Sequence, residues 1–146
     1  SAHAGERRCS FQGVLNAARH AADWFGCNVA VEGHYPERGN TEKYHVSTWD
    51  EYRALFESGV PYALDLSHLN IVAHFTQRFE TTLVTEMLAC ERCIEVHLSD
   101  NDGRGDQHQT LKDEPWWWSL LPHFHANTVI FTEGNHRRQR RMESIR

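Results

Sequence analysis

The sequence predicts an α/β fold made of repeated strand and helix units around a parallel sheet. Four short apolar stretches each end at a charged or imidazole side chain, at Glu32, Asp65, His97 and Glu133. These positions lie 33, 32 and 36 residues apart, and a stretch with helical periodicity separates each pair. A regular alternation of strands and helices is typical of a parallel sheet.

The composition limits the class of protein. A length of 146 residues suits one domain with its own core. The net charge of -5 argues against a nucleic-acid partner, because phosphate binding depends on Lys and Arg. No apolar run is long enough to span a membrane, and four Cys without dense spacing indicate reduced thiols, so we expect a cytoplasmic protein. Cys90 and Cys93 form a single CxxC pair and are expected to be structural.

The first unit contains a predicted helix and a buried strand. Residues 1–5, SAHAG, resemble the end of a strand that runs into a turn. Ser10 is a suitable N-cap, apolar residues then recur at helical spacing, and Gly26 ends the helix. The stretch 27–32, CNVAVE, follows as a strand with Glu32 at its tip. His34 comes just after this tip, and we interpret it as a loop residue rather than a ligand.

The second unit begins with a helix in residues 47–59, which Ser47 or Thr48 caps and Gly59 ends. Residues 60–66, VPYALDL, form the next predicted strand, with Asp65 at its tip. His68 follows three residues later, where a further helix begins. Helical segments over 67–79 and 82–90 then lead to the next strand.

Residues 93–108, CIEVHLSDNDGRGDQH, are the densest candidate for function. Alternating apolar residues meet Asn-Asp-Gly, which predicts a strand that stops at a turn and places His97 at the strand's C-terminal end. Asp106 and His108 lie two residues apart on an extended loop and can point to the same side.

The last part of the chain contains tryptophans, a strand and a basic end. Pro115 begins a predicted helix with three consecutive tryptophans, Trp116 to Trp118, which cannot share one helix face. We interpret them as packing against strands outside this chain, in preference to a ligand-stacking platform. Residues 127–133, NTVIFTE, form the last strand. We therefore divide the chain into a β/α domain, 1–135, and a basic C-terminal tail, 136–146.

The four strand tips predict a metal centre. The C-terminal ends of parallel strands meet at one edge of the sheet, so these side chains should converge. Three clustered carboxylates repel one another, and a divalent cation removes this repulsion. We therefore expect Glu32, Asp65, His97 and Glu133 to bind one divalent metal ion, for which Mn, Zn, Mg and Co are all suitable.

The whole constellation resembles the xylose isomerase-like TIM barrel superfamily. That superfamily includes sugar-phosphate isomerases and epimerases and an endonuclease branch that acts at abasic sites. The resemblance rests on seven residues in the family's order: Glu32, Asp65, His68, His97, Asp106, His108 and Glu133. It implies an incomplete TIM barrel of parallel β/α units, about the C-terminal half to five-eighths of the eight strands. The chain would then be a fragment, or another chain or a second copy would supply the missing strands.

Similarity to the epimerase branch implies that Glu32 and Glu133 act as acid and base, and that His68 and Arg104 hold substrate oxygens. The expected activity is that of a divalent-metal-dependent sugar or sugar-phosphate isomerase or epimerase. Such an enzyme moves a proton next to a metal-bound carbonyl or hydroxyl. The expected partner is a small polar substrate such as a carbohydrate.

Similarity to the endonuclease branch implies a different arrangement. His68, Asp106 and His108 would hold a further metal, and His3, in His-Ala-Gly, would also be a ligand. The alternative function is therefore a multinuclear metal-dependent phosphoesterase. A third possibility is a catalytically inert half-barrel subunit, which would self-associate or bind a partner because missing strands leave sheet edges exposed.

Overall fold

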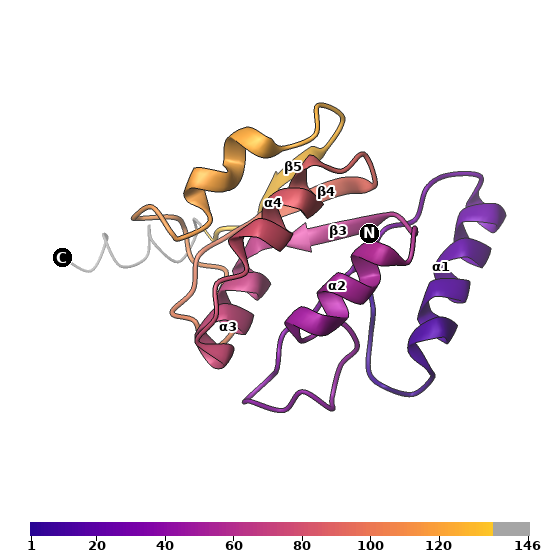
Figure 1. Cartoon of the computed structure of the whole chain (residues 1–146), viewed down its shortest axis with the longest axis horizontal. Helices are drawn as coiled ribbons and strands as arrows, with labels where there is room; N and C mark the ends of the chain where they lie inside the picture. Colours follow the sequence, from indigo (N-terminus) through magenta and orange to yellow (C-terminus); the bar gives the residue numbers. More distant parts are fainter. Residues whose placement is uncertain (136–146) are drawn as a thin grey trace.

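The computed structural model describes residues 1–135 and contains five parallel strands in one sheet (Figure 1). The strands are β1 (Ala2–His3), β2 (Val31–Glu32), β3 (Tyr62–Asp65), β4 (Cys93–Leu98) and β5 (Val129–Thr132). They lie in the sheet in the order of the chain, β1-β2-β3-β4-β5. The predicted α/β class with parallel units is confirmed. Within the described residues β1 and β5 are the two edges of the sheet, and the predicted basic tail, 136–146, lies outside these residues.

The predicted strand tips fall where the sequence indicated. Glu32 and Asp65 are the last residues of β2 and β3, and His97 is the last but one of β4. Asp65 and His97 are register partners across the β3–β4 pair. Glu133 follows β5 directly, and its backbone N–H donates to the Leu98 carbonyl at 2.9 Å. All four side chains therefore start at the same edge of the sheet.

The first two helices have the caps that the sequence predicted. In α1 (Phe11–Phe25) the Ser10 hydroxyl accepts a hydrogen bond from the Gly13 N–H, and Gly26 ends the helix in the left-handed region, at φ 65°. In α2 (Trp49–Glu57) the N-cap is Thr48, so the second of the two candidate caps is the correct one. Figure 1 shows α1 at the right of the view, away from β4 and β5.

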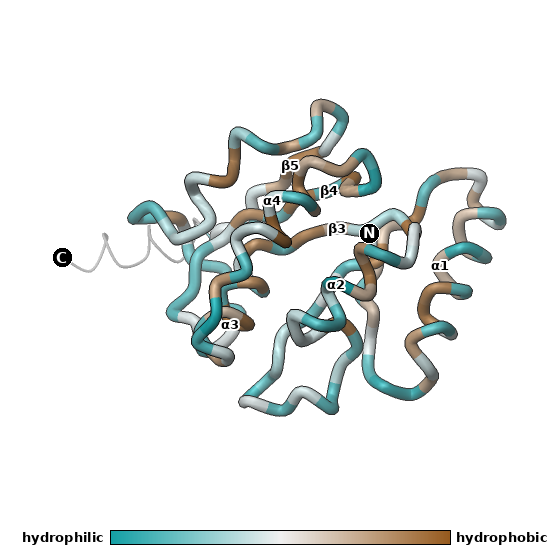
Figure 2. The backbone as a smooth tube through the Cα atoms, in the orientation of Figure 1, coloured by the Kyte–Doolittle hydropathy of each residue, from teal (hydrophilic) through white to brown (hydrophobic). Residues whose placement is uncertain are grey.

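Two further helices, α3 (Leu66–Thr76) and α4 (Thr81–Ala89), connect β3 to β4. The core lies between the helices and the sheet and is formed by aliphatic and aromatic side chains, among them Leu55, Tyr62, Leu64, Leu69, Leu83, Met87, Leu88 and Val96. Figure 2 shows hydrophobic residues along β3 and hydrophilic ones in the loop between β2 and α2. The four cysteines are free, and Cys93 is buried in β4, as a structural cysteine should be.

The tryptophan segment differs from its prediction. Instead of an α-helix from Pro115 there is a turn followed by a short 3-10 helix, η1 (Trp118–His123). Pro122 lies inside this segment and has no N–H to donate, which disfavours a regular α-helix. The expected packing against strands outside the chain is wrong for Trp117, which is 1% exposed within this chain's own core. It is also wrong for Trp116, whose indole N–H donates to Asn70 Oδ1 at 3.1 Å.

The longest of the described helices, α1, has 15 residues. In residues 1–135 no helix combines the length and the apolar character needed to cross a bilayer.

Candidate metal centre

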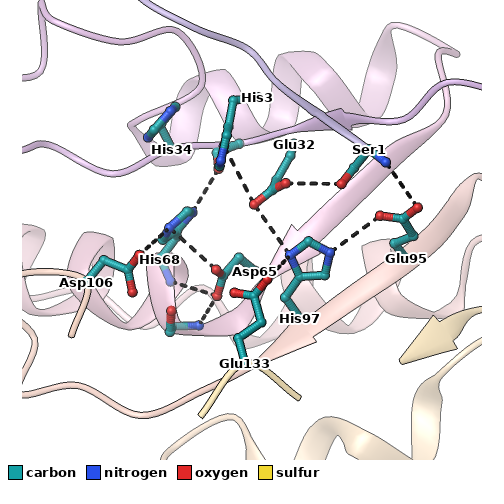
Figure 3. A network of polar contacts seen from close by, with 12 residues as sticks. Ser1, His3, Glu32, His34, Asp65, His68, Glu95, His97, Asp106 and Glu133 are labelled. Atoms are coloured by element: carbon teal, nitrogen blue, oxygen red, sulfur yellow. Dashed lines mark hydrogen bonds and ion pairs between the residues drawn. The ribbon is translucent and has the colours of Figure 1, made fainter. Parts of the chain in front are cut away.

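The side chains of the other three strand-tip residues, Glu32, Asp65 and Glu133, lie around His97, as Figure 3 shows. Its Nδ1 atom lies 3.5 Å from Glu32 Oε1 and 3.5 Å from Glu133 Oε1. Asp65, His97 and Glu133 each offer a ligand atom, and these atoms lie within 4.8 Å of one another. Glu32, Asp65 and His97 are buried. Three of the four residues predicted to share one metal ion thus form one group, and Glu32 adjoins it through His97 while forming a second group with Asp65 and His68.

The spacing of these atoms fits a bound ion. Nitrogen and oxygen ligands about 2.1 Å from a tetrahedral ion lie roughly 3.4 Å from one another. The two contacts of His97 Nδ1, at 3.5 Å, are close to that value and too long for strong hydrogen bonds. Moreover, His97 Nδ1 is a buried atom without a hydrogen-bond partner in the structure. An ion between this nitrogen and the carboxylates of Asp65 and Glu133, whose ligand atoms lie within 4.8 Å of one another, would satisfy it.

Local structure orients the ligands. The Asp65 side chain caps α3, because its Oδ1 atom accepts hydrogen bonds from the N–H groups of Ser67 at 2.8 Å and His68 at 3.3 Å. Its other oxygen, Oδ2, is left to face the site. Gly33, directly after Glu32, is held against Tyr52, since a Cβ there would lie 2.5 Å from the tyrosine ring. A larger residue at position 33 would therefore displace the tip of β2.

Glu95 is a site residue that the sequence interpretation missed. Its Oε2 atom lies 3.4 Å from His97 Nε2, the ring nitrogen opposite the proposed ligand atom. A carboxylate at this position fixes the orientation of a ligating imidazole. The alternation of side chains along a strand could have identified it, because residues two apart on β4 share one face.

The electrostatics of the site favour positive charge between the carboxylates. Burial opposes ionisation of Glu32, but contact with His97 and the charges of His3 and His68 hold its pKa below the usual value. The close approach of Glu32 raises the pKa of His97 to about 9 despite burial. Without a metal ion a proton on His97 thus neutralises part of the carboxylate charge, and a divalent ion could replace that proton.

A second group of possible ligands adjoins the first. His68 Nε2 lies 3.4 Å from Asp65 Oδ2 and 3.5 Å from Asp106 Oδ2. His108 Nε2 contacts the same Asp106 oxygen at 2.9 Å, and His108 Nδ1 lies 3.5 Å from Glu133 Oε2. Asp106 Oδ1 and His108 Nδ1 are buried atoms without hydrogen-bond partners. The loop after β4 therefore brings Asp106 and His108 to the same site, in agreement with the prediction that their side chains can point to the same side.

His68 connects the two groups. It is 3% exposed, and its Nδ1 atom lies 3.0 Å from the Gly33 carbonyl. Burial lowers the pKa of His68, but Asp65 and then Asp106 raise it more strongly, to about 9. Glu32, Asp65 and His68 also form a group whose ligand atoms lie within 4.8 Å of one another. Asp65 is therefore common to both possible metal positions.

Two more histidines border the centre. His3 Nδ1 lies 3.6 Å from Glu32 Oε1, and the His3 ring stacks on that of His34 at 4.6 Å. His34 lies in the loop after β2, as expected, and stacks on Tyr44 at 4.1 Å. Burial, together with the positive charges of His3 and His68, lowers the pKa of His34 to about 4. The neutral imidazole of His34 thus borders the site. Its position depends on ring stacking with residues distant in the sequence, so no local sequence pattern could have predicted it.

Arg104 is the one predicted site residue that does not join this network. Among residues 1–135 it forms no ion pair with the carboxylates of the centre, and its exposed side chain lines a surface hollow instead. Its backbone N–H donates to Asp102 Oδ1 at 3.0 Å. This hydrogen bond forms a turn in which the loop leads away from the centre. The direct role in holding substrate at the metal that the resemblance implied has no support in this geometry.

All the other predicted residues belong to one continuous series of side-chain contacts. The series runs from His3 through Glu32, His97, Glu133, His108, Asp106 and His68 to Asp65. Buried groups of Glu, Asp and His that could hold a metal ion are thus present in the chain. Comparison with known proteins identifies no family, since no family model, no curated protein and no solved structure matches the sequence or the fold.

Proposed function

We propose that this chain is part of a divalent-metal-dependent isomerase or epimerase that acts on a sugar or sugar phosphate. One observation carries the proposal: the partnerless Nδ1 atom of His97 lies between carboxylate oxygens of Glu32 and Glu133, at 3.5 Å from each. The resemblance to the xylose isomerase-like superfamily supports it, and in that case the five strands are a segment of a TIM barrel. The order of the strands is the order in a barrel wall.

The four strand-tip residues would hold the ion, which would polarise a substrate carbonyl and its neighbouring hydroxyl. Glu32 is buried and has a lowered pKa, so it is ionised at neutral pH and can accept a proton. The Glu133 side chain is more open, at 33% exposure, and can reach a substrate that enters from the loop side. A substrate carbon between them would lose its proton to one carboxylate and gain one from the other, which inverts that carbon.

The proposal predicts that Glu133→Gln keeps the fold and much of the metal binding but loses turnover. The probe is deuterium uptake from D2O into a panel of ketoses and ketose phosphates by the metal-loaded chain, followed by mass spectrometry. General acid and base groups contribute about 10²-fold or more, so uptake should fall by at least that factor. Glu86→Gln, an exposed change on α4, is the control and should leave uptake unchanged. A Glu133→Gln protein with full activity would contradict the proposal.

Metal-assisted hydrolysis of a phosphoester is the second candidate, and a separate observation favours it. The group formed by His68, Asp106 and His108 adjoins Asp65, whose Oδ2 atom lies 3.4 Å from His68 Nε2, and it has two buried atoms without partners. Two or three ions per chain, together with hydrolysis of bis(p-nitrophenyl) phosphate, would favour this function. One ion per chain and no hydrolysis would favour the isomerase.

A further inference from the structure

A surface hollow of about 430 Å³ is lined in part by the loops after β2 and β4, which also carry residues of the metal centre. Its walls come from three segments: the loop after β2, one side of α3 and the loop after β4. Arg38 contributes from the first loop, His74 from α3 and Arg104 from the second loop. None of these three residues has a place in the chemistry proposed above.

The two arginines of the hollow form no ion pair within residues 1–135, although Arg38 and Arg104 lie near the carboxylates of Glu37 and Asp102. In the described part of the chain the arginines that form ion pairs are Arg7, Arg8 and Arg78, whereas Arg38 and Arg104 form none. A guanidinium offers several N–H donors in one plane, which suits the oxygens of phosphate or carboxylate. Two such groups facing one hollow make it a candidate anion site.

The carboxylates near the hollow already have hydrogen-bond or ion-pair partners within the protein. Asp102 lines it, but hydrogen bonds from the Gln107 side chain and the Arg104 N–H lower the pKa of this carboxyl. Glu37, next to Arg38, is paired with Lys43 and accepts a hydrogen bond from the Tyr44 hydroxyl at 3.0 Å. Two guanidiniums therefore face one carboxylate, and the hollow keeps a positive charge.

The wall of the hollow is built by close backbone packing. Gly103 has φ 77°, and a Cβ at this position would lie 2.4 Å from the His74 ring, so only glycine fits. The Gly103 N–H donates to Asn101 Oδ1 at 2.9 Å, and the buried Asn101 accepts a second hydrogen bond from Asn70 Nδ2, also at 2.9 Å. The loop that carries Arg104 is thus fixed to α3 before any ligand binds, which lowers the entropic cost of binding.

Both loops of the hollow continue directly into the metal centre. Arg104 lies two residues before Asp106, whose carboxylate contacts His68. Pro36 follows Tyr35, whose ring centroid lies 4.9 Å from that of His68. One small molecule could therefore place an anionic end in the hollow and its reacting carbon at the metal.

We propose that the hollow between Arg38, His74 and Arg104 binds the phosphate group of the substrate, which makes that substrate a phosphorylated small molecule. The anion site stands on the hollow itself, whereas its link to the substrate rests on the proposed function. Arg104 then acts on the substrate at a distance from the metal instead of beside it.

The test is calorimetric titration of inorganic phosphate into the full chain at constant ionic strength, once loaded with metal and once with a chelator present. Phosphate should bind in both states. Arg38→Gln and Arg104→Gln should each weaken binding by at least about tenfold, since each removes a charge-assisted contact. Arg53→Gln removes an exposed charge from α2 and should have no effect. Gly103→Ala should weaken binding without a change of charge, whereas Gly105→Ala, with nothing within 4 Å of the new Cβ, should not.

Unchanged affinity in both arginine variants would overturn the anion site. Phosphate binding that the chelator abolishes would also overturn it, because the phosphate would then be on the metal, and the metal centre would still stand. Phosphate binding by a chain that takes up no metal would support the hollow and contradict the proposed function. Deuterium uptake that is no faster with ketose phosphates than with ketoses would overturn the link to the substrate.

Discussion

His97 is the residue on which the centre depends, and its protonation opposes metal binding. Contact with Glu32 raises the pKa of His97 to about 9 in the metal-free chain, from a usual value of 6.5. This raised pKa stabilises the fold below pH 6.5, and that stabilisation is lost as the pH rises through about 9. A metal ion binds the neutral imidazole. The affinity for the metal must therefore rise with pH, as His97 loses its proton.

We therefore predict that the affinity for Zn²⁺ rises with pH between 7 and 9, by about tenfold per unit if one proton is released. Competition with a chelating dye at each pH measures this affinity after correction for the dye's own protonation. His97→Gln cannot take up the proton and should give a weaker and flatter profile. An affinity that stays constant across this range would show that His97 is not a ligand.

At the scale of the elements, buried amides join the loop after β4 to the first turns of α3. Asn101 Nδ2 donates to the Ser67 carbonyl at 2.8 Å, and Asn101 Oδ1 accepts from Asn70 Nδ2 and the Gly103 N–H. This network fixes the loop that supplies Asp106. The centre and the hollow thus depend on the same buried contacts.

Asn101→Ala should lower the free energy of unfolding by about 2–3 kcal/mol, because it leaves buried polar groups of the loop and α3 without partners. Urea unfolding followed by circular dichroism measures the change. Asn16→Ala, on the exposed face of α1, is the control and should cost no more than about 0.5 kcal/mol. Equal losses in the two variants would show that the network does not hold the loop.

The elements that the sequence predicts well are those with local signals. Ser10 and Gly26 bound α1 because a cap depends on a few neighbouring residues. Asp65 was predictable as a strand tip, and the same local geometry makes it the cap of α3. The convergence of the strand tips followed from the βα repeat, which places every C-terminal strand end on one side.

Other features depend on contacts that are distant in the sequence. Trp116 bonds to Asn70, 46 residues away, and Trp117 enters the core of this chain, which no local pattern indicated. Arg104 lies in a loop whose direction is set by Gly103 against His74, so its place in the hollow could not be predicted from its distance to His97.

At the scale of the whole molecule, the sheet has an apolar edge. Within the described residues β5 pairs only with β4, and its side chains Val129, Ile130 and Phe131 are 51%, 48% and 47% exposed. An exposed apolar edge strand is a site for pairing with another chain. We propose that a second copy or a partner covers this edge.

Sedimentation velocity over a range of concentrations should therefore detect association of the chain. Ile130→Lys places a charge on the edge strand and should shift the population toward the monomer. Trp24→Lys, which removes an 86% exposed side chain from α1, is the control and should leave association unchanged. A wild-type chain that stays monomeric at every concentration would contradict covering by a second copy.

The binding of a divalent ion by the strand-tip residues is the central claim, and metal content after gel filtration tests it most directly. The chain is equilibrated with Zn²⁺ or Mn²⁺, separated from free ion and analysed by mass spectrometry of the metal. We predict at least one equivalent bound to the wild type, and a clear loss in His97→Ala and Asp65→Asn with the fold retained by circular dichroism. A wild-type chain that binds no ion, or variants that bind as much as the wild type, would contradict the account.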